Sequence, residues 1–223
     1  GKGLVRPGGV VRGIEPDLAA SLAATLAKLG DDASAYADAL FSSASVLSRL
    51  ENAGVVDRET AVAIGMVGPA ARASGRAIDV RSDHPAGAYE TYPIHKIALE
   101  SGDVFARAFI RSVEIGQSLS LARDILAGPG LAGGLSAAGA CGSLEPIGAL
   151  APDRIAVRLV EGWRGEICHA ALSDSEGNLR RYKIVDPSFK NWTALALAVR
   201  GNGISDFPIC NKSFNLSYCG FDL

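Results

Sequence analysis

The sequence lacks any long uninterrupted apolar run, and it lacks an excess of charge of either sign. About 48% of the residues are apolar, but no run approaches the ~20 residues that span a bilayer, so we expect no transmembrane segment. The 22 basic residues are interspersed with 24 acidic ones, for a net charge of −2. Binding to nucleic acid or to an anionic membrane surface needs a basic face, so we expect neither.

Cysteines are also few, and they stand far apart at positions 141, 168, 210 and 219. No pair has the C-x-x-C spacing of a zinc or redox site, and the three histidines form no metal-binding spacing with one another. The simplest interpretation is that the cysteines are small buried hydrophobic residues. The alternative is a cluster ligand made where two or more of them converge in the fold.

Helical periodicity dominates the first part of the chain. Residues 1–13 are rich in Gly, Arg and Val and predict an extended arm. Leucines at helical spacing then predict a helix that begins after Pro16 and ends at Gly30 as its C-terminal cap. A second helix is predicted over residues 32–50, antiparallel to the first, as in a helix bundle.

The next segment is broken by glycine and proline and then returns to a long helix. A short helix is predicted over residues 58–65, followed by an irregular stretch up to residue 97. Asp103 follows a glycine and is a good N-cap for a third long helix, which is expected to end near Leu126. Residues 128–143 are nearly all Gly, Ala, Leu and Ser and predict a loose loop.

After residue 150 the pattern changes to short strands. Strands are predicted over residues 155–160, 167–172 and 180–185, with a hairpin turn at residues 174–178. A short helix over 192–199 and a tail that is largely loop complete the chain. We therefore predict an α+β fold that is mainly α, with a helix-bundle core and a small antiparallel β element. It forms one region, with a helical part at 1–150 and a β-hairpin, short helix and tail at 151–223.

The third long helix carries a charged stripe, and its other faces are mostly apolar, which is typical of a buried helix. The stripe recurs at helical spacing and consists of Asp103, Arg107, Arg111, Glu114 and Ser118. A structural ion-pair network is one interpretation. The other is a charged axis beside a redox or proton-coupled site.

Two further motifs combine rigid backbone with charged side chains. The first is Gly68-Pro69-x-x-Arg72-x-Ser74-Gly75, followed by Asp79-Val-Arg81, and by spacing it predicts a rigid loop held by salt bridges. The second is Glu161-Gly-Trp-Arg164-Gly-Glu166. Its arginine either begins a surface hairpin or faces a cavity.

Six motifs in order resemble a known family: the large subunit of membrane-bound [NiFe] hydrogenases of the formate hydrogenlyase type, and the hydrogenase-like subunit of the complex I quinone module. They are Gly-Pro-x-x-Arg-Ala-Ser-Gly, Asp-Val-Arg, Gly-Asp-Val-Phe-Ala-Arg, Arg-Gly-Glu, Pro-Ser-Phe-Lys-Asn-Trp and Asp-Phe-Pro. The resemblance implies the C-terminal region of such a subunit. It makes Arg164, Glu166, Asp103 and Arg111 candidate catalytic residues around a cavity.

The resemblance also implies that the metal chemistry is lost. In metal-bearing members the segment that aligns with residues 215–220 reads Asp-Pro-Cys-x-x-Cys, and both cysteines hold the nickel–iron centre. Here the two ligand positions are Ser217 and Gly220, and neither offers the soft thiolate that the metal prefers. A one-residue slip of the backbone would bring Cys219 into the site. We predict no metal and no other cofactor in this chain, and the sequence does not decide whether quinone binds.

The function implied by the resemblance is that of an oxidoreductase subunit. We expect a hydrogenase-like subunit of a complex I-like membrane assembly, cytoplasmic and peripheral to the inner membrane, that takes part in electron relay or redox coupling. An iron–sulfur subunit and membrane subunits are its expected partners. Two alternatives stay open, an active [NiFe] hydrogenase and a purely structural assembly subunit.

Overall fold

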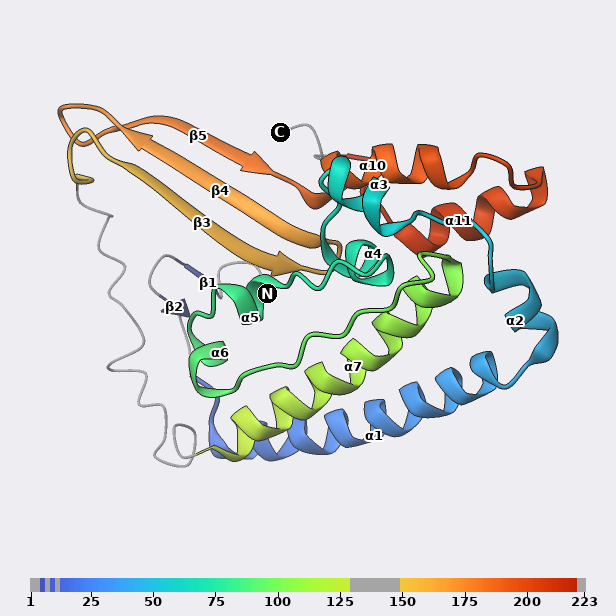
Figure 1. Ribbon diagram of the computed structural model, residues 1–223. Coiled ribbons are helices and arrows are strands. Elements are labelled where there is room, and N and C mark those ends of the chain that lie inside the picture. Colours follow the sequence, from blue (N-terminus) through green and yellow to red (C-terminus); the bar gives the residue numbers. More distant parts are fainter. Residues whose placement is uncertain (1–4, 7–8, 11–12, 129–148, 220–223) are drawn as a thin grey trace. The chain divides into compact units, whose positions relative to one another are not determined.

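The computed structural model describes residues 5–6, 9–10, 13–128 and 149–219, and these are mainly helical with one three-stranded antiparallel sheet (Figure 1). The predicted α+β class is confirmed. Contacts divide the chain into two compact parts, one of residues 1–36 and 115–148 and one of residues 37–114 and 149–223. The second part, called the main part below, contains both clusters of charged residues described below.

The first helix, α1, is continuous over Pro16–Phe41. The predicted end at Gly30 is therefore wrong. A glycine inside a helix costs only about 1 kcal/mol, and the alanines and leucines on both sides of Gly30 favour the helix. The chain leaves the helix at Ser42 and Ser43 instead, where serine competes for backbone hydrogen bonds, and α2 follows over Ala44–Leu50.

The glycine-rich stretch holds more helix than predicted. As expected, α3 forms, over Arg58–Ala63, with Asp57 as its N-cap. The segment predicted as irregular then contains α4 over Gly68–Ala73, α5 over Val80–Asp83 and α6 over Ala88–Thr91. Each is too short to show a helical period in the sequence, which explains why the pattern predicted no helix here.

The long helix α7 spans Val104–Ala127, close to the predicted range. Asp103 caps it as predicted, because the backbone N–H of Ala106 donates to Asp103 Oδ1 at 2.8 Å. Burial is confined to its first turns, and positions 115–127 are half-buried or exposed. The expectation that the whole helix is buried is therefore wrong for its second half.

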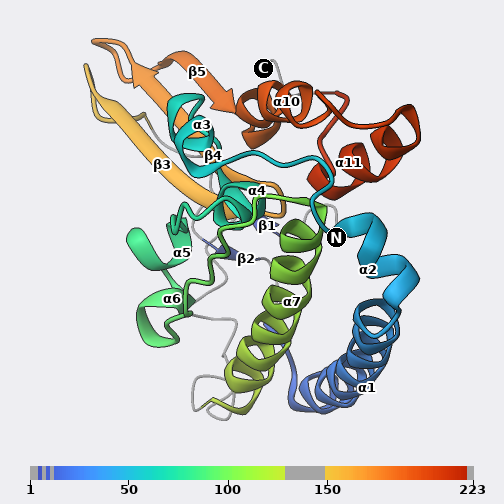
Figure 2. The same cartoon turned by 45° about the vertical axis from the view of Figure 1, so that its right-hand side comes forward.

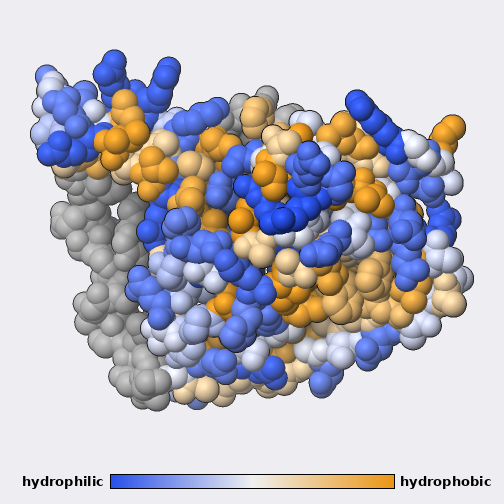
Figure 3. Space-filling view, in the orientation of Figure 1, coloured by the Kyte–Doolittle hydropathy of each residue, from blue (hydrophilic) through white to orange (hydrophobic). Residues whose placement is uncertain are grey.

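The sheet consists of β3 (Ile155–Gly162), β4 (Gly165–Ser173) and β5 (Leu179–Val185), with β4 in the middle. The predicted turn is confirmed: the Asp174 carboxylate accepts from the backbone N–H groups of Glu176 and Asn178. At the end of the sheet near this turn, exposed apolar residues stand among charged ones (Figure 3). The other end of the β3–β4 hairpin is a two-residue turn, Trp163-Arg164.

The tail is helical rather than loop, so that prediction is wrong. The short helix predicted over 192–199 is confirmed as α10, which begins earlier and spans Pro187–Ala198. In the tail beyond it, η1 spans Ile204–Asp206 and α11 spans Phe207–Phe214. Proline in the first turn of α10 and of α11 is compatible with helix. The left-handed conformation of Asn215 (φ 54°) ends α11.

The core of the main part is rich in alanine, which lets backbones approach closely. Its buried members come from α3, α4, α7, α10, α11 and the loops between them, and include Ala61, Ala70, Ala71, Ala194 and Ala198. Figure 2 shows α10 beside the end of the sheet, α11 next to α10, and α4 at the tip of the β3–β4 hairpin. Among the described residues, no helix has the length and apolar character needed to cross a bilayer. At the N-terminus, β1 (Val5–Arg6) and β2 (Gly9–Val10) pair antiparallel, while the predicted loop at 129–143 lies outside the described residues.

Candidate functional site

The tip of the β3–β4 hairpin is in direct contact with the start of α4. Gly68 has φ +69° and Gly165 has φ +130°, and a Cβ atom on either would collide with the backbone of the other segment. Asn191 on α10 joins the two segments, because its amide Nδ2 donates to Val67 O at 3.1 Å and to Arg164 O at 3.3 Å. The two glycine-containing motifs of the sequence therefore form one rigid junction.

Beside this junction lies a buried ionic cluster that we call the acidic network: Arg72, Asp79, Arg81, Glu114 and Glu161. At its centre is Arg72, whose side chain is 1% exposed and lies 2.8 Å from Glu114, 3.0 Å from Glu161 and 3.3 Å from Asp79. Arg81 pairs with Asp79 at 2.7 Å. The network connects α4, the 79–81 segment, α7 and β3, so four separate segments depend on one guanidinium.

Burial and charge act in opposite directions on the groups of this network. Burial alone would lower the pKa of Arg72, but the carboxylates of Glu114, Glu161 and Asp79 outweigh it and raise that pKa. Burial raises the pKa of Glu161, and the neighbouring Arg72 only partly counteracts this effect. The arginines of the network therefore stay charged, while Glu161 is shifted toward its neutral form.

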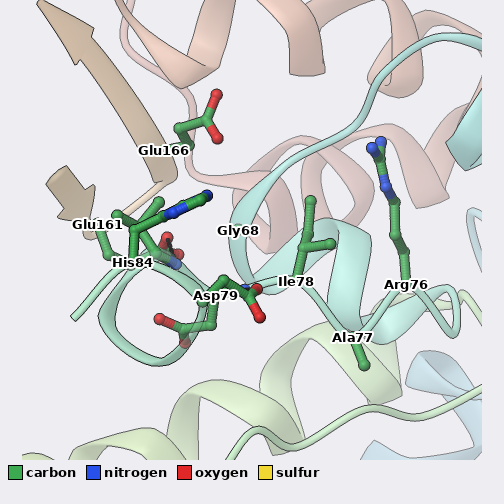
Figure 4. Close-up of a pocket in the computed structure, with 10 residues that line it drawn as sticks. Gly68, Arg76, Ala77, Ile78, Asp79, His84, Glu161 and Glu166 are labelled. Atoms are coloured by element: carbon green, nitrogen blue, oxygen red, sulfur yellow. Dashed lines mark hydrogen bonds between the residues drawn. The ribbon is translucent and has the colours of Figure 1, made fainter. Parts of the chain in front are cut away.

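A cavity of about 370 Å³ opens next to the network (Figure 4). Four carboxylates line it, from Asp79, Asp83, Glu161 and Glu166. His84 lies beside Glu161 in the view of Figure 4, and Arg76 lies at the opposite end, where its guanidinium donates to Met66 O at 2.9 Å. We call this space the acidic cavity.

A second group of arginines binds backbone oxygens instead of carboxylates. Arg107 donates to Gly54 O, Gly102 O and Ser213 Oγ at 2.7–2.9 Å. Arg111 donates to Ser213 O at 2.6 Å and to Phe214 O at 3.1 Å, and Arg164 donates to Asn215 O. We call Arg107, Arg111 and Arg164 the carbonyl clamp, because together they hold residues 213–215 at the end of α11.

Burial lowers the pKa of Arg107 to about 9 and that of Arg111 to about 10, so both guanidiniums remain charged at neutral pH. Arg107 also lies over the ring of Phe214, 4.3 Å from its centroid, where a cation–π contact stabilises it. The clamp thus places positive charge beside the C-terminal segment without a carboxylate bound directly to Arg107 in the described contacts.

An apolar cavity of about 410 Å³ lies against the clamp. Apolar side chains of α1, α2, α7 and α11 line it together with Trp163, and its charged lining residues are Arg111 and Lys212. The Nε atom of Arg111 is buried and has no hydrogen-bond partner among the described residues. These two cavities therefore differ in charge, since the first is acidic and the second is apolar with two cations.

The segment after the clamp carries Ser217, one of the two positions that the resemblance to metal-bearing members identifies with metal ligands. The Ser217 hydroxyl donates to Cys219 O at 2.5 Å, and the Ser217 N–H donates to Ser188 Oγ at 3.0 Å. Gly220 lies outside the described residues. Over the described parts of the chain, no group of three or more His, Cys, Asp or Glu side chains is arranged to hold a metal ion. The Ser217 hydroxyl is not the soft thiolate that a nickel–iron centre prefers.

Comparison with known proteins shows the family of the chain. Residues 2–130 and 145–222 match the family described as the 49 Kd subunit of respiratory-chain NADH dehydrogenase. The chain belongs to this family. A carbon monoxide-induced hydrogenase of Rhodospirillum rubrum is 32% identical over 175 residues, which cover 77% of this chain and 45% of the relative.

Other relatives match over more of the chain. A subunit of the NADH-quinone oxidoreductase of Herpetosiphon aurantiacus is 29% identical over 95% of this chain and 56% of its own length. Among solved structures, an archaeal membrane-bound sulfane sulfur reductase complex contains a chain with a TM-score of 0.82 and 26% identity, covering 97% of this chain and 58% of that one. The chain thus spans about half the length of the relatives that it matches.

The four candidate catalytic residues predicted from the sequence do not form one site in this member of the 49 Kd family. Arg111 and Arg164 meet at residues 213–215, and Glu166 lines the acidic cavity and pairs with Lys190 at 3.1 Å. The Asp103 carboxylate is occupied by Ala106 N, Asn52 N and Ser101 Oγ. Asp103 is therefore a helix cap that also fixes a neighbouring loop.

From the charged stripe of α7, Glu114 joins the ion-pair network around Arg72, whereas Arg107 and Arg111 bind carbonyl oxygens in the described contacts. The salt bridges predicted for the Gly68–Gly75 motif form at Arg72 and Asp79, but the prediction of a loop is wrong, because Gly68–Ala73 is the helix α4. Sequence reasoning missed Glu161 and Asn191 as site residues. For Glu161 a signal existed, because it stands in the same short motif as Arg164, but nothing in the pattern showed that it points at Arg72.

The cysteines follow the simplest interpretation only in part. Cys210 is fully buried in the core, as predicted for a small hydrophobic residue, and its burial raises the pKa of the thiol. Cys168 is half-buried and Cys219 is exposed, so the prediction is wrong for Cys219. Cys141 lies outside the described residues.

Proposed function

We propose that this chain is part of a subunit of a membrane-associated respiratory oxidoreductase complex, in which it takes part in electron relay or redox coupling without holding nickel. Family membership over nearly the whole chain supports the assignment to such a complex. The named relatives include a subunit of NADH-quinone oxidoreductase and a chain of a respiratory membrane complex. The expected partners are an iron–sulfur subunit and membrane subunits, and the expected location is cytoplasmic, at the inner membrane.

The observation that carries the nickel-free part of the proposal is the chemistry of the segment beyond the carbonyl clamp. A serine hydroxyl that donates to a backbone carbonyl stands at one ligand position. Nickel and iron in such sites favour soft thiolate ligands. The clamp that holds the segment is nevertheless in place, with three arginines on residues 213–215. We infer a family scaffold that keeps its charged surroundings and not its metal ligands.

Elemental analysis of the full-length protein, purified with its neighbouring subunits, tests this proposal. We expect no nickel, and iron only at the level of the clusters in partner subunits. One nickel for each copy of the subunit would contradict the proposal and favour an active [NiFe] hydrogenase; the R. rubrum relative is named as a hydrogenase.

A purely structural role is the second candidate, and one observation favours it. The hydrogen bonds that Arg111 and Arg164 donate go to backbone carbonyl oxygens, as in a structural clamp. Electron transfer through the assembled complex distinguishes the two functions. A relay or coupling role predicts that Arg164→Gln lowers the rate in a complex that still assembles, whereas an unchanged rate would favour the structural role.

A further inference from the structure

The acidic network contains one more carboxylate than it contains guanidiniums. Arg72 and Arg81 face Asp79, Glu114 and Glu161, and all five side chains are at most 15% exposed. Removing an unbalanced charge from water is costly, and a buried carboxylate in this position lowers the cost by taking up a proton. One member of the network is therefore expected to hold a proton more readily than an ordinary carboxylate.

The register of the sheet identifies that member. Glu161 on β3 stands directly opposite Glu166 on β4. Like charges that face each other across two strands repel. Glu166 has its own cation, Lys190 on α10 at 3.1 Å. Asp79 holds Arg81 through both of its oxygens. Glu114 has Arg81 at 3.8 Å in addition to Arg72. Among the described ion pairs Glu161 has Arg72 alone, and it shares Arg72 with two other carboxylates. Its negative charge is therefore the least compensated of the three.

Glu161 also has access to protons, because it lines the acidic cavity although its side chain is only 4% exposed. Arg72 donates to its Oε1 at 3.0 Å, and the Val80 N–H donates to its Oε2 at 3.2 Å. A carboxylate oxygen has two lone pairs. A proton can thus be added on one oxygen while the contact to Arg72 on the other is kept.

We propose that Glu161 is a proton-binding site of this subunit, which takes a proton from water in the acidic cavity and returns it there. In this step the carboxylate and a hydronium ion become a carboxylic acid and a water molecule, and no electron moves. Burial, the excess carboxylate and the facing Glu166 all favour the protonated form. Arg72 and the Val80 N–H favour the charged form, so the site can release its proton.

Charged and titratable groups surround this carboxyl from every neighbouring element. They are Arg72 on α4; Arg76, Asp79, Arg81, Asp83 and His84 in the 76–84 segment; Arg111 and Glu114 on α7; Glu166 on β4; and Lys190 on α10. Burial raises the pKa of Glu161, which agrees with the geometry.

The proton site deepens the proposed function and rests on it for its purpose. Glu161 lies three residues before Arg164 in the hairpin whose tip meets both α4 and the C-terminal segment. A change of one charge at Glu161 alters the electrostatic attraction between Arg72 on α4 and the Glu161 carboxylate on β3. Uptake of a proton there would balance an electron that arrives at a neighbouring redox centre, as redox coupling requires.

Infrared difference spectroscopy against pH tests the proposal on the full-length protein in its complex. We expect a carbonyl band of a protonated carboxylic acid that titrates above the ordinary glutamate pKa of about 4.3. The band should disappear in Glu161→Gln, whose amide oxygen can still accept from Arg72. Glu166→Gln is the matched control, because it removes the opposite carboxylate of the same cavity, and it should keep the band and shift its midpoint to lower pH.

Two outcomes would overturn the proposal: a Glu161→Gln protein that keeps the band, or an unmodified protein with no carboxyl that titrates above the ordinary range. The second can be read without any variant. If Glu161→Gln does not fold, Glu166→Gln decides the assignment, because a midpoint that does not shift in this variant would place the band elsewhere than opposite Glu166 and overturn the proposal. The spectra do not need turnover. A complex that transfers no electrons would contradict the proposed function, while the band would still decide the proton site.

Discussion

The acidic network and the carbonyl clamp are built from the same residue type and give opposite electrostatic results. In the network, Arg72 and Arg81 meet three carboxylates, and the cluster is left with an excess of negative charge. In the clamp, Arg107, Arg111 and Arg164 meet backbone carbonyls and a serine hydroxyl, and the positive charge is left. Both groups touch α7, at neighbouring turns.

The difference shows what each arrangement is suited to do. A carboxylate-paired arginine fixes several segments and leaves a group that can change charge, because a buried carboxylate can take up a proton while the guanidiniums stay charged at neutral pH. A carbonyl-bound arginine satisfies the orphan carbonyls at the end of a helix such as α11 and favours that end electrostatically. The main part therefore keeps a proton-accepting region and a fixed positive region close together.

The largest effect should come from removing the centre of the network. Arg72→Met leaves Glu114, Glu161 and Asp79 buried without their common partner, and we expect a loss of about 3–5 kcal/mol in the free energy of unfolding. Denaturant unfolding measures it. Arg49→Met is the control, since Arg49 pairs with Asp206 at 3.7 Å on the surface, and we expect a change below about 1 kcal/mol. Equal losses in both variants would mean that burial of the network does not increase its contribution to the free energy of unfolding.

A smaller effect is expected at the junction between the two regions. Gly68 and Gly65 share a φ of +69°, but a Cβ on Gly68 would collide with the hairpin tip, and a Cβ on Gly65 meets nothing within 4 Å. Gly65→Ala should cost about 1–2 kcal/mol for the left-handed conformation alone. Gly68→Ala should cost about 1–3 kcal/mol more, because the tip must move. Thermal or denaturant unfolding of both variants measures the difference, and equal costs would show that the close approach is easily relieved.

The smallest effect should appear in the clamp and should be local. Arg111→Gln removes the donors to Ser213 O and Phe214 O, and we expect the amide of Ser217 to exchange with solvent about tenfold faster, as for a loss of about 1.4 kcal/mol in local stability. Hydrogen exchange measures it. Lys212→Gln removes the exposed cation of the same cavity and should leave this amide unchanged. Faster exchange in both variants would point to loss of charge, and not of the hydrogen bonds, as the cause.

Much of the fold could be predicted from local patterns, and the errors have a common cause. Strand alternation and the turn at 174–178 were sufficient for the sheet, because both depend on neighbouring residues. The pattern wrongly predicted a helix end at Gly30 and loop at residues 207–214. In each case a single glycine or proline outweighed a helical preference that the surrounding residues and their packing support.

The sequence motifs predicted which segments contain the site residues, but not which of these residues contact one another. The sequence placed Arg72 and Asp79 in one rigid segment and Arg164 and Glu166 in another. It did not show that Arg72 reaches Glu161, 89 positions later, because residue spacing carries no information on contacts between distant elements. For the same reason the stripe on α7 predicted ion pairs where Arg107 and Arg111 bind carbonyls.

By itself, the sequence determined the family and the mainly helical class, because these are properties of residue identity and order. Tertiary structure alone decided which arginines meet carboxylates and which meet carbonyls, and that Glu161 faces Glu166 beside a cavity. Charge balance in a protein interior is a sum over groups that only the folded chain brings within a few ångströms of one another.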